Sequence, residues 1–146
     1  MLTAVATVTA LAMPASIAAF ALSPSASAAG SSVTCKKLTG TITGSITISK
    51  CSPKSKANKS ASGVAASLAT GGTVTWSKSG QTTTVSLSTS SPGQGACKAG
   101  STEYDVSGSV TGGTSTYTHT GDVVSGKACA TSSGSLSLVK GTVLGL

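Results

Sequence analysis

The sequence predicts an all-β protein: a single antiparallel β-sandwich or small β-barrel of about eight strands, with two disulfides, after an N-terminal signal peptide. Three observations support this prediction. Apolar residues alternate with Ser and Thr along short stretches, and glycine-rich turns separate those stretches. The chain has four cysteines, an even number that suits an exported domain. No segment after the leader shows the apolar spacing of a helix.

The N-terminal stretch has the composition of a signal peptide. It is almost entirely Ala, Val, Leu, Ile, Thr and Ser, and it is followed by an Ala-Ser-Ala tripeptide ending at Ala28, which suits signal peptidase. No Lys or Arg precedes the apolar run, and an uncleaved membrane anchor is the alternative interpretation. We expect a signal peptide at 1–28 and a secreted all-β domain at 29–146 without a transmembrane segment.

The alternation is clearest at residues 38–49. The even positions are Leu, Gly or Ile, and the odd positions are Thr or Ser. Because successive side chains of a strand point to opposite faces, this stretch is predicted to be a strand or strand pair with one apolar face. Gly40 or Gly44 is expected to bend or split it. Residues 106–112 repeat the same residue classes.

The remaining elements follow in order between glycine turns. A loop with Pro53 and several lysines is expected at 51–62, and a second loop, which contains Cys97, is expected at 90–100. Trp76 is expected to anchor a core that has few large side chains. The further strands that alternation predicts lie at 64–68, 73–77, 82–88, 104–110, 117–119, 123–130, 134–138 and in the C-terminal segment GTVLGL.

The four cysteines allow three pairings, of which we expect Cys35–Cys51 and Cys97–Cys129. These are the local pairs, and each encloses one copy of the repeated strand motif. In the chain-entropy model, a bridge of either span stabilises the fold by about 3–4 kcal/mol.

The net charge of +7 arises from ten lysines and three acids, without any Arg. A Cys35–Cys51 bridge places three lysines beside the 51–62 loop, and this predicts a basic patch. Such a patch either attracts anionic envelope polymers or keeps a chain with few acids soluble. The lack of Arg and of interleaved aromatic residues argues against nucleic acid as the partner. The predicted polyanion-binding residues are Lys36, Lys37, Lys50, Lys54, Lys56 and Lys59.

Catalytic and metal-binding signals are weak in this sequence. His119 is the single His, no G-x-S-x-G motif is present, and one His cannot make a zinc site when the cysteines are oxidised. Glu103 and Asp105 are two residues apart and could share a strand face, but they make a poorly motivated glycosidase pair. We therefore expect no enzyme, no metal and no cofactor.

The hydroxyl-rich strand faces have two interpretations. They could bind ordered water, sugars or a partner, or carry O-linked sugars. Thr also suits a half-solvated strand and discourages edge-to-edge aggregation, which is the interpretation we favour.

The chain resembles small exported all-β proteins of actinobacteria that have no assigned activity. The residues that carry this resemblance are the Ala/Thr leader ending in Ala-Ser-Ala, the four cysteines and the TGTITG and SGSVTG segments. Size and cysteine number are also similar to neocarzinostatin-like sandwiches and subtilisin-inhibitor proteins. The Met-centred reactive loop of the inhibitors is not matched, because Met1 and Met13 are the only methionines. The resemblance implies an exported β-domain and no site residues.

The sequence does not specify the ligand. We expect a secreted, non-catalytic β-domain that binds an anionic envelope polymer or an extracellular protein through the lysine patch. One alternative is an inhibitor or small-ligand carrier that uses rigid loops at 52–60 or 90–100. The other is a small hydrolase that uses His119.

Overall fold

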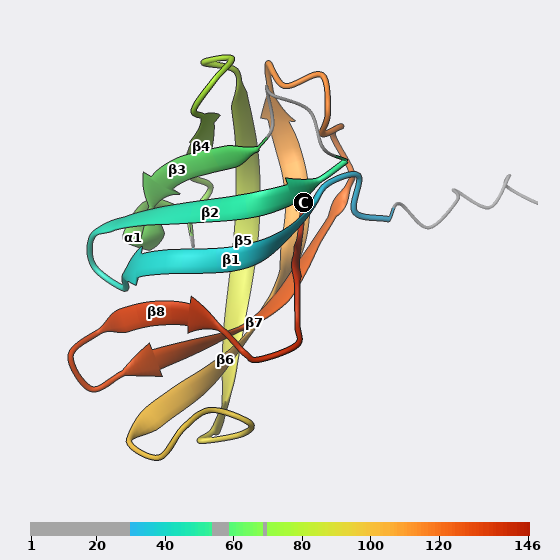
Figure 1. The fold of residues 1–146 in the computed structure, drawn as a ribbon. Coiled ribbons are helices and arrows are strands. Elements are labelled where there is room, and N and C mark those ends of the chain that lie inside the picture. Colours follow the sequence, from blue (N-terminus) through green and yellow to red (C-terminus); the bar gives the residue numbers. More distant parts are fainter. Residues whose placement is uncertain (1–29, 54–58, 69) are drawn as a thin grey trace, which may run out of the picture.

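A computed structural model describes residues 30–53, 59–68 and 70–146; the predicted signal peptide at 1–28 lies outside them. The described chain forms one sheet in the order β2-β3-β4-β5-β6-β7-β8-β1-β9. Because β1 also pairs with β2, strands β1 to β8 close into an antiparallel barrel, and β9 is added beside β1 and β7 (Figure 1). The elements are β1 (Thr34–Thr41), β2 (Ser45–Ser52), β3 (Ser60–Val64), α1 (Ala65–Leu68), β4 (Thr73–Trp76), β5 (Thr82–Gly93), β6 (Ser101–Gly113), β7 (Val123–Thr131), β8 (Ser135–Leu138) and β9 (Leu144–Gly145). The predicted all-β class is confirmed, and of the two predicted architectures, sandwich or small barrel, the structure is the barrel.

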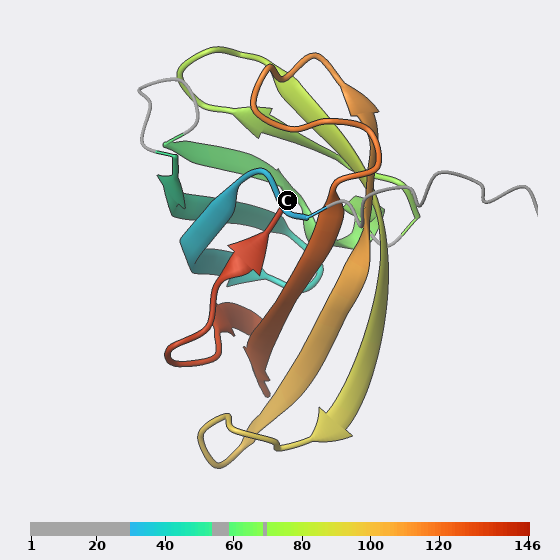
Figure 2. The same ribbon diagram turned by 90° about the vertical axis from the view of Figure 1, so that its right-hand side faces the viewer.

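The strands form two curved layers around the core. In Figure 1, β1, β2 and β8 lie in front, and β5, β6 and β7 cross behind them at a steep angle. Figure 2 shows how the long strands β5 and β6 curve along one side of the molecule. The buried apolar side chains of both layers pack against one another between them.

The stretch 38–49 is a strand pair: β1 and β2 form a hairpin with its turn at 42–44. The register pairs Leu38 with Ile48 and Gly40 with Ile46. Even-numbered residues of both strands therefore share one face, and Leu38, Ile46 and Ile48 are buried there. A side chain at Gly40 would have its Cβ 2.7 Å from the Ile46 Cα, so only glycine permits this approach. Ile42, in the turn, stays 38% exposed.

Trp76 is fully buried, as predicted, and its indole is held by a short chain of hydroxyls. The Trp76 Nε1–H donates to Thr83 Oγ1 at 2.9 Å, and Thr83 Oγ1 lies 2.7 Å from Thr118 Oγ1. All three residues are buried. This network satisfies polar groups that would otherwise be costly to bury in a core this small.

The predicted strand at 64–68 is wrong. β3 ends at Val64, and Ala65–Leu68 forms α1, a single helical turn. Ala and Leu are strong helix formers. The Ala65 N–H still donates to the Gly44 carbonyl at 3.0 Å, one pair beyond the last β2–β3 partners Ser45 and Val64, and the chain leaves the sheet after that bond. Leu68 is still buried. α1 is the one helix in the described part of the chain, where no helix is long and apolar enough to cross a membrane.

The predicted return strand at 117–119 is also wrong, because residues 114–122 form an irregular loop. The alternation there placed Tyr117 and His119 on one face, yet Thr118 is the buried residue and His119 is exposed. The hydrogen bond between the Thr118 and Thr83 hydroxyls explains the difference, since it holds the Thr118 side chain inward. The loops at 51–62 and 90–100 are shorter than predicted, because β2, β3 and β5 extend into them.

Both predicted disulfides are confirmed. Cys35 and Cys51 lie directly opposite each other on β1 and β2, and Cys97 bonds Cys129 of β7. The first bridge fastens the hairpin at the end remote from its turn. The second ties the loop after β5 to the barrel wall.

Replacing Thr83 by Val should destabilise the protein by about 1–3 kcal/mol, because the buried Trp76 indole loses its acceptor. Urea unfolding followed by Trp76 fluorescence measures the change. Thr75→Val, at an exposed position of β4, is the matched control and should shift the free energy of unfolding by less than about 0.5 kcal/mol. Equal effects of the two substitutions would contradict a stabilising role for the network.

Candidate functional site

The inward faces of the barrel strands and α1 line an apolar cavity of about 280 Å³. Residues from both layers and from α1 contribute to its wall. The described lining residues are Leu38, Ile42, Ile46, Ala65, Ala66, Leu68, Leu87, Thr89, Tyr104, Val106, Gly126, Lys127, Ala128, Leu136, Leu138 and Leu144.

The cavity exists because small residues stand where large ones would fill the barrel. Ala128 lies on β7, and Ala65 and Ala66 form the first half of α1. Gly126 also lines the cavity, but a Cβ there would lie 2.8 Å from Leu144 Cδ1, so this glycine makes room for β9. Leucines and valines on the neighbouring strands are therefore only half-buried, although they point inward. Inward-facing side chains of an eight-stranded barrel either just fill the interior or leave room for one small ligand.

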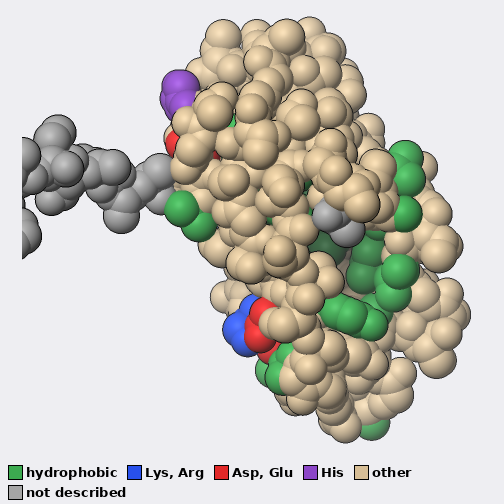
Figure 3. All heavy atoms as spheres, turned by 180° about the vertical axis from the view of Figure 1, so that it is seen from behind, with side chains coloured by type: hydrophobic (Ala, Val, Ile, Leu, Met, Phe, Trp, Pro, Cys, Tyr) green, Lys and Arg blue, Asp and Glu red, His purple; other side chains and the backbone are tan. Residues whose placement is uncertain are grey.

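The cavity opens to solvent on one side. Figure 3, viewed from behind Figure 1, shows hydrophobic side chains gathered around a hollow in a surface that otherwise carries few charges. Ile42, at the turn of the β1–β2 hairpin, lines the cavity and is 38% exposed. The exposed Ala66 of α1 also lines it. Ile42 and Ala66 therefore mark the solvent-exposed mouth of the cavity.

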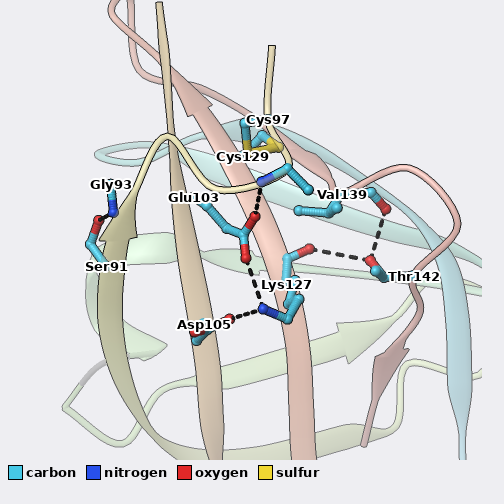
Figure 4. Close-up of polar contacts among 10 residues, drawn as sticks. Ser91, Gly93, Cys97, Glu103, Asp105, Lys127, Cys129, Val139 and Thr142 are labelled. Atoms are coloured by element: carbon cyan, nitrogen blue, oxygen red, sulfur yellow. Dashed lines mark hydrogen bonds and ion pairs between the residues drawn. A yellow bond between two sulfur atoms is a disulfide. The ribbon is translucent and has the colours of Figure 1, made fainter. Parts of the chain in front are cut away.

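Few polar groups face the cavity. Among its described lining residues, Thr89, Tyr104 and Lys127 have polar side chains. The Lys127 ammonium is directed to the outer face of β6 and β7, where it contacts Glu103 and Asp105 (Figure 4). Apart from Lys127, the described lining is apolar except for the two neutral hydroxyls of Thr89 and Tyr104.

On the outer face, Lys127 lies between two carboxylates. Its Nζ is 2.8 Å from Glu103 Oε1 and 2.7 Å from Asp105 Oδ1. Glu103 is only 3% exposed because the loop after β5 covers it, and its Oε2 accepts a 2.6 Å hydrogen bond from the Ala96 N–H. A Cβ at Gly95 would overlap the Glu103 carboxylate. The disulfide between Cys97 and Cys129 holds this loop in place (Figure 4).

These contacts change the protonation equilibria. The hydrogen bond from Lys127, followed by that from the Ala96 N–H, lowers the pKa of Glu103 below its usual value. The hydrogen bonds to Asp105 and Glu103 raise the pKa of Lys127. Both shifts favour the charged forms, so the cluster is a stable ion pair that fastens the loop. Because Lys127 occupies both carboxylates, neither is poised for glycosidase chemistry.

The structure places His119 near a serine and an acid, but not as a catalytic triad. Ser32 Oγ lies 3.4 Å and Asp122 Oδ2 3.7 Å from the same ring atom, Nδ1 of His119. In a triad the nucleophile and the acid contact opposite ring nitrogens. The His119 side chain is also 71% exposed. Its backbone N–H donates to Asp122 Oδ2 at 2.7 Å, an arrangement typical of a loop.

No group of three or more His, Cys, Asp or Glu in the described ranges could hold a metal ion. The four lysines of the predicted patch that are described, Lys36, Lys37, Lys50 and Lys59, are all exposed. Lys54 and Lys56 lie outside the described residues. The 52–60 loop is described only in part, and the 90–100 loop begins at Gln94, after β5 ends.

Sequence reasoning did not find the cavity. The available signal was a small residue at a predicted inward position, such as Ala128 in the otherwise apolar series of its strand. Alternation shows which residues point inward, but not whether the side chains of opposite walls meet.

The Glu103→Gln variant should lose part of the acid sensitivity of folding. A carboxyl whose folded pKa is lowered stabilises the fold above its unfolded pKa, and this contribution is lost as the pH falls through the folded pKa. The wild-type melting temperature should therefore fall more steeply than that of Glu103→Gln between about pH 5 and pH 3. Lys98→Gln, in the same loop, is the control and should keep the wild-type slope; parallel curves for Glu103→Gln and wild type would refute the assignment.

The described structure thus has one apolar cavity that opens to solvent and one ion-paired cluster that holds the loop after β5. Comparison with models of protein families, with curated proteins and with solved structures finds no match to this chain.

Proposed function

We propose that this protein is an exported, non-catalytic carrier that binds a small, uncharged apolar molecule in the cavity of its barrel. One observation carries the proposal: a closed barrel encloses an aliphatic-lined space of about 280 Å³ that its own side chains leave unfilled. The sequence predicted a small-ligand carrier as one alternative, with its site on the loops at 52–60 or 90–100. The proposal moves that site to the barrel interior.

The size of the cavity suits a small molecule. An apolar cavity of about 150 Å³, engineered into another protein, binds benzene. The present cavity is nearly twice as large and is comparable with small ligand sites. A ligand that binds the folded cavity and not the unfolded chain would stabilise the fold.

The lining selects for apolar, neutral ligands. Burying a charge without a partner is costly, and Lys127 is already paired with Glu103 and Asp105 on the outer face. Tyr104 and Thr89 can each offer one hydroxyl to a carbonyl or hydroxyl of the ligand. An aromatic or terpenoid compound with at most one or two polar atoms meets these conditions.

Export is supported by the cysteines. All four form disulfides in the structure, and such bridges persist in oxidising compartments. The predicted leader at 1–28 would deliver the chain there.

Titration with N-phenyl-1-naphthylamine, a neutral apolar fluorophore, tests the proposal. We expect saturable one-to-one binding, energy transfer from Trp76 and a raised melting temperature. Ala128→Leu should weaken binding at least tenfold, about 1.4 kcal/mol, because the larger side chain would occupy part of the cavity volume that the fluorophore needs. Ala66→Leu, at the exposed mouth, should weaken binding without disturbing the core.

Val123→Leu is the matched control, since Val123 is exposed on the same strand as Ala128 and does not line the cavity. It should bind the fluorophore as wild type does. Unsaturable fluorescence, or equal affinity of all four proteins, would defeat the carrier proposal.

A further inference from the structure

The lysines cluster at one end of the β1–β2 hairpin. Lys36 and Lys37 are consecutive on β1 and both exposed, because burial passes from Cys35 to Leu38 across them instead of alternating. The partner strand shows the same change at Lys50, whose φ is 56° and whose neighbour Cys51 is buried. The Lys59 carbonyl accepts a hydrogen bond from the Cys51 N–H at 3.4 Å. We call Lys36, Lys37, Lys50 and Lys59 the lysine end.

The acids of the chain do not neutralise the lysine end. The sequence has three acids. In the described structure, Glu103 and Asp105 pair with Lys127, and Asp122 lies beside His119. The disulfide between Cys35 and Cys51 holds the two strands together at this end. The disulfide thus holds the strands that carry these lysines, and within the described residues no carboxylate side chain is paired with them. The lysine end can therefore contact an anionic partner.

The cavity mouth lies at the other end of the same hairpin. Ile42 lines the mouth and is six residues from Lys36 along the chain, which at about 3.3 Å per residue is a separation of roughly 20 Å. We infer that the lysine end docks this protein on a phosphate-bearing anionic polymer of the cell envelope and leaves the cavity mouth directed away from it.

The chemistry of the surface favours such a polymer over the other polyanions. Lysine ammonium groups are point charges on flexible stems and tolerate irregular phosphate spacing, whereas nucleic acid recognition relies on arginine forks and stacked aromatics. Membrane association needs an apolar face beside the cations. Near the lysine end, Val143 is the one exposed large apolar residue in the described part of the chain.

Binding of the full chain to immobilised poly(glycerol phosphate) tests the inference. In 50 mM NaCl, Lys36→Gln/Lys37→Gln should bind at least fivefold more weakly than wild type. Its affinity should also depend less on salt: the slope of the logarithm of the binding constant against the logarithm of the NaCl concentration should be smaller in magnitude by roughly 1–2. Lys98→Gln/Lys140→Gln carries the same net charge, at exposed positions away from the lysine end, and should bind as wild type does.

Three results would overturn the inference: equal weakening in both double variants, wild-type binding that persists at 1 M NaCl, or tighter binding to duplex DNA or to phosphatidylglycerol vesicles. The inference does not depend on the cavity ligand. N-phenyl-1-naphthylamine should bind both double variants with wild-type affinity, so failure at one site is distinguishable from failure at the other.

Discussion

Strand β1 pairs with β2 along one edge and with β8 and β9 along the other, and this double pairing closes the sheet. Closure removes the free strand edges that would otherwise invite aggregation. It also creates an interior whose width is set by the number of strands rather than by the side chains available to fill it. The cavity and the core both follow from this constraint.

The interior is filled unevenly. Trp76 belongs to a buried apolar cluster, and its indole N–H donates to the Thr83 hydroxyl, which is in turn hydrogen-bonded to Thr118. Elsewhere, small residues such as Ala65, Ala66 and Ala128 line a cavity that the side chains leave unfilled. A domain with so few large side chains gains less from hydrophobic burial, and the disulfides offset part of that shortage by restricting the unfolded chain. Sparse packing and cross-linking are thus two parts of one arrangement, and together they leave room for a ligand.

Charge is distributed to separate places. Glu103 holds the loop after β5 by accepting a hydrogen bond from the Ala96 N–H and pairing with Lys127. Asp122 lies beside His119 in the loop after β6. Most lysines remain exposed, and four gather where the hairpin is bridged. The ion pair of Lys127 illustrates why charge patterns in sequence are hard to interpret: Glu103 and Asp105 resemble a catalytic pair until the opposite strand brings a cation between them.

Local alternation determined much of this protein from sequence alone: the all-β class, the inward residues of the hairpin, of β5 and of β6, the buried Trp76 and the two local disulfides. Each depends on the period of a strand or on short loop closure, which neighbouring residues dictate. Only the tertiary structure decided barrel over sandwich, the helical turn α1, the inward Thr118 and the cavity. These features depend on how the side chains of opposite barrel walls meet and on hydrogen bonds between residues far apart in the sequence. The alternation of apolar and polar residues shows which way a side chain points, but not how far it lies from the opposite wall.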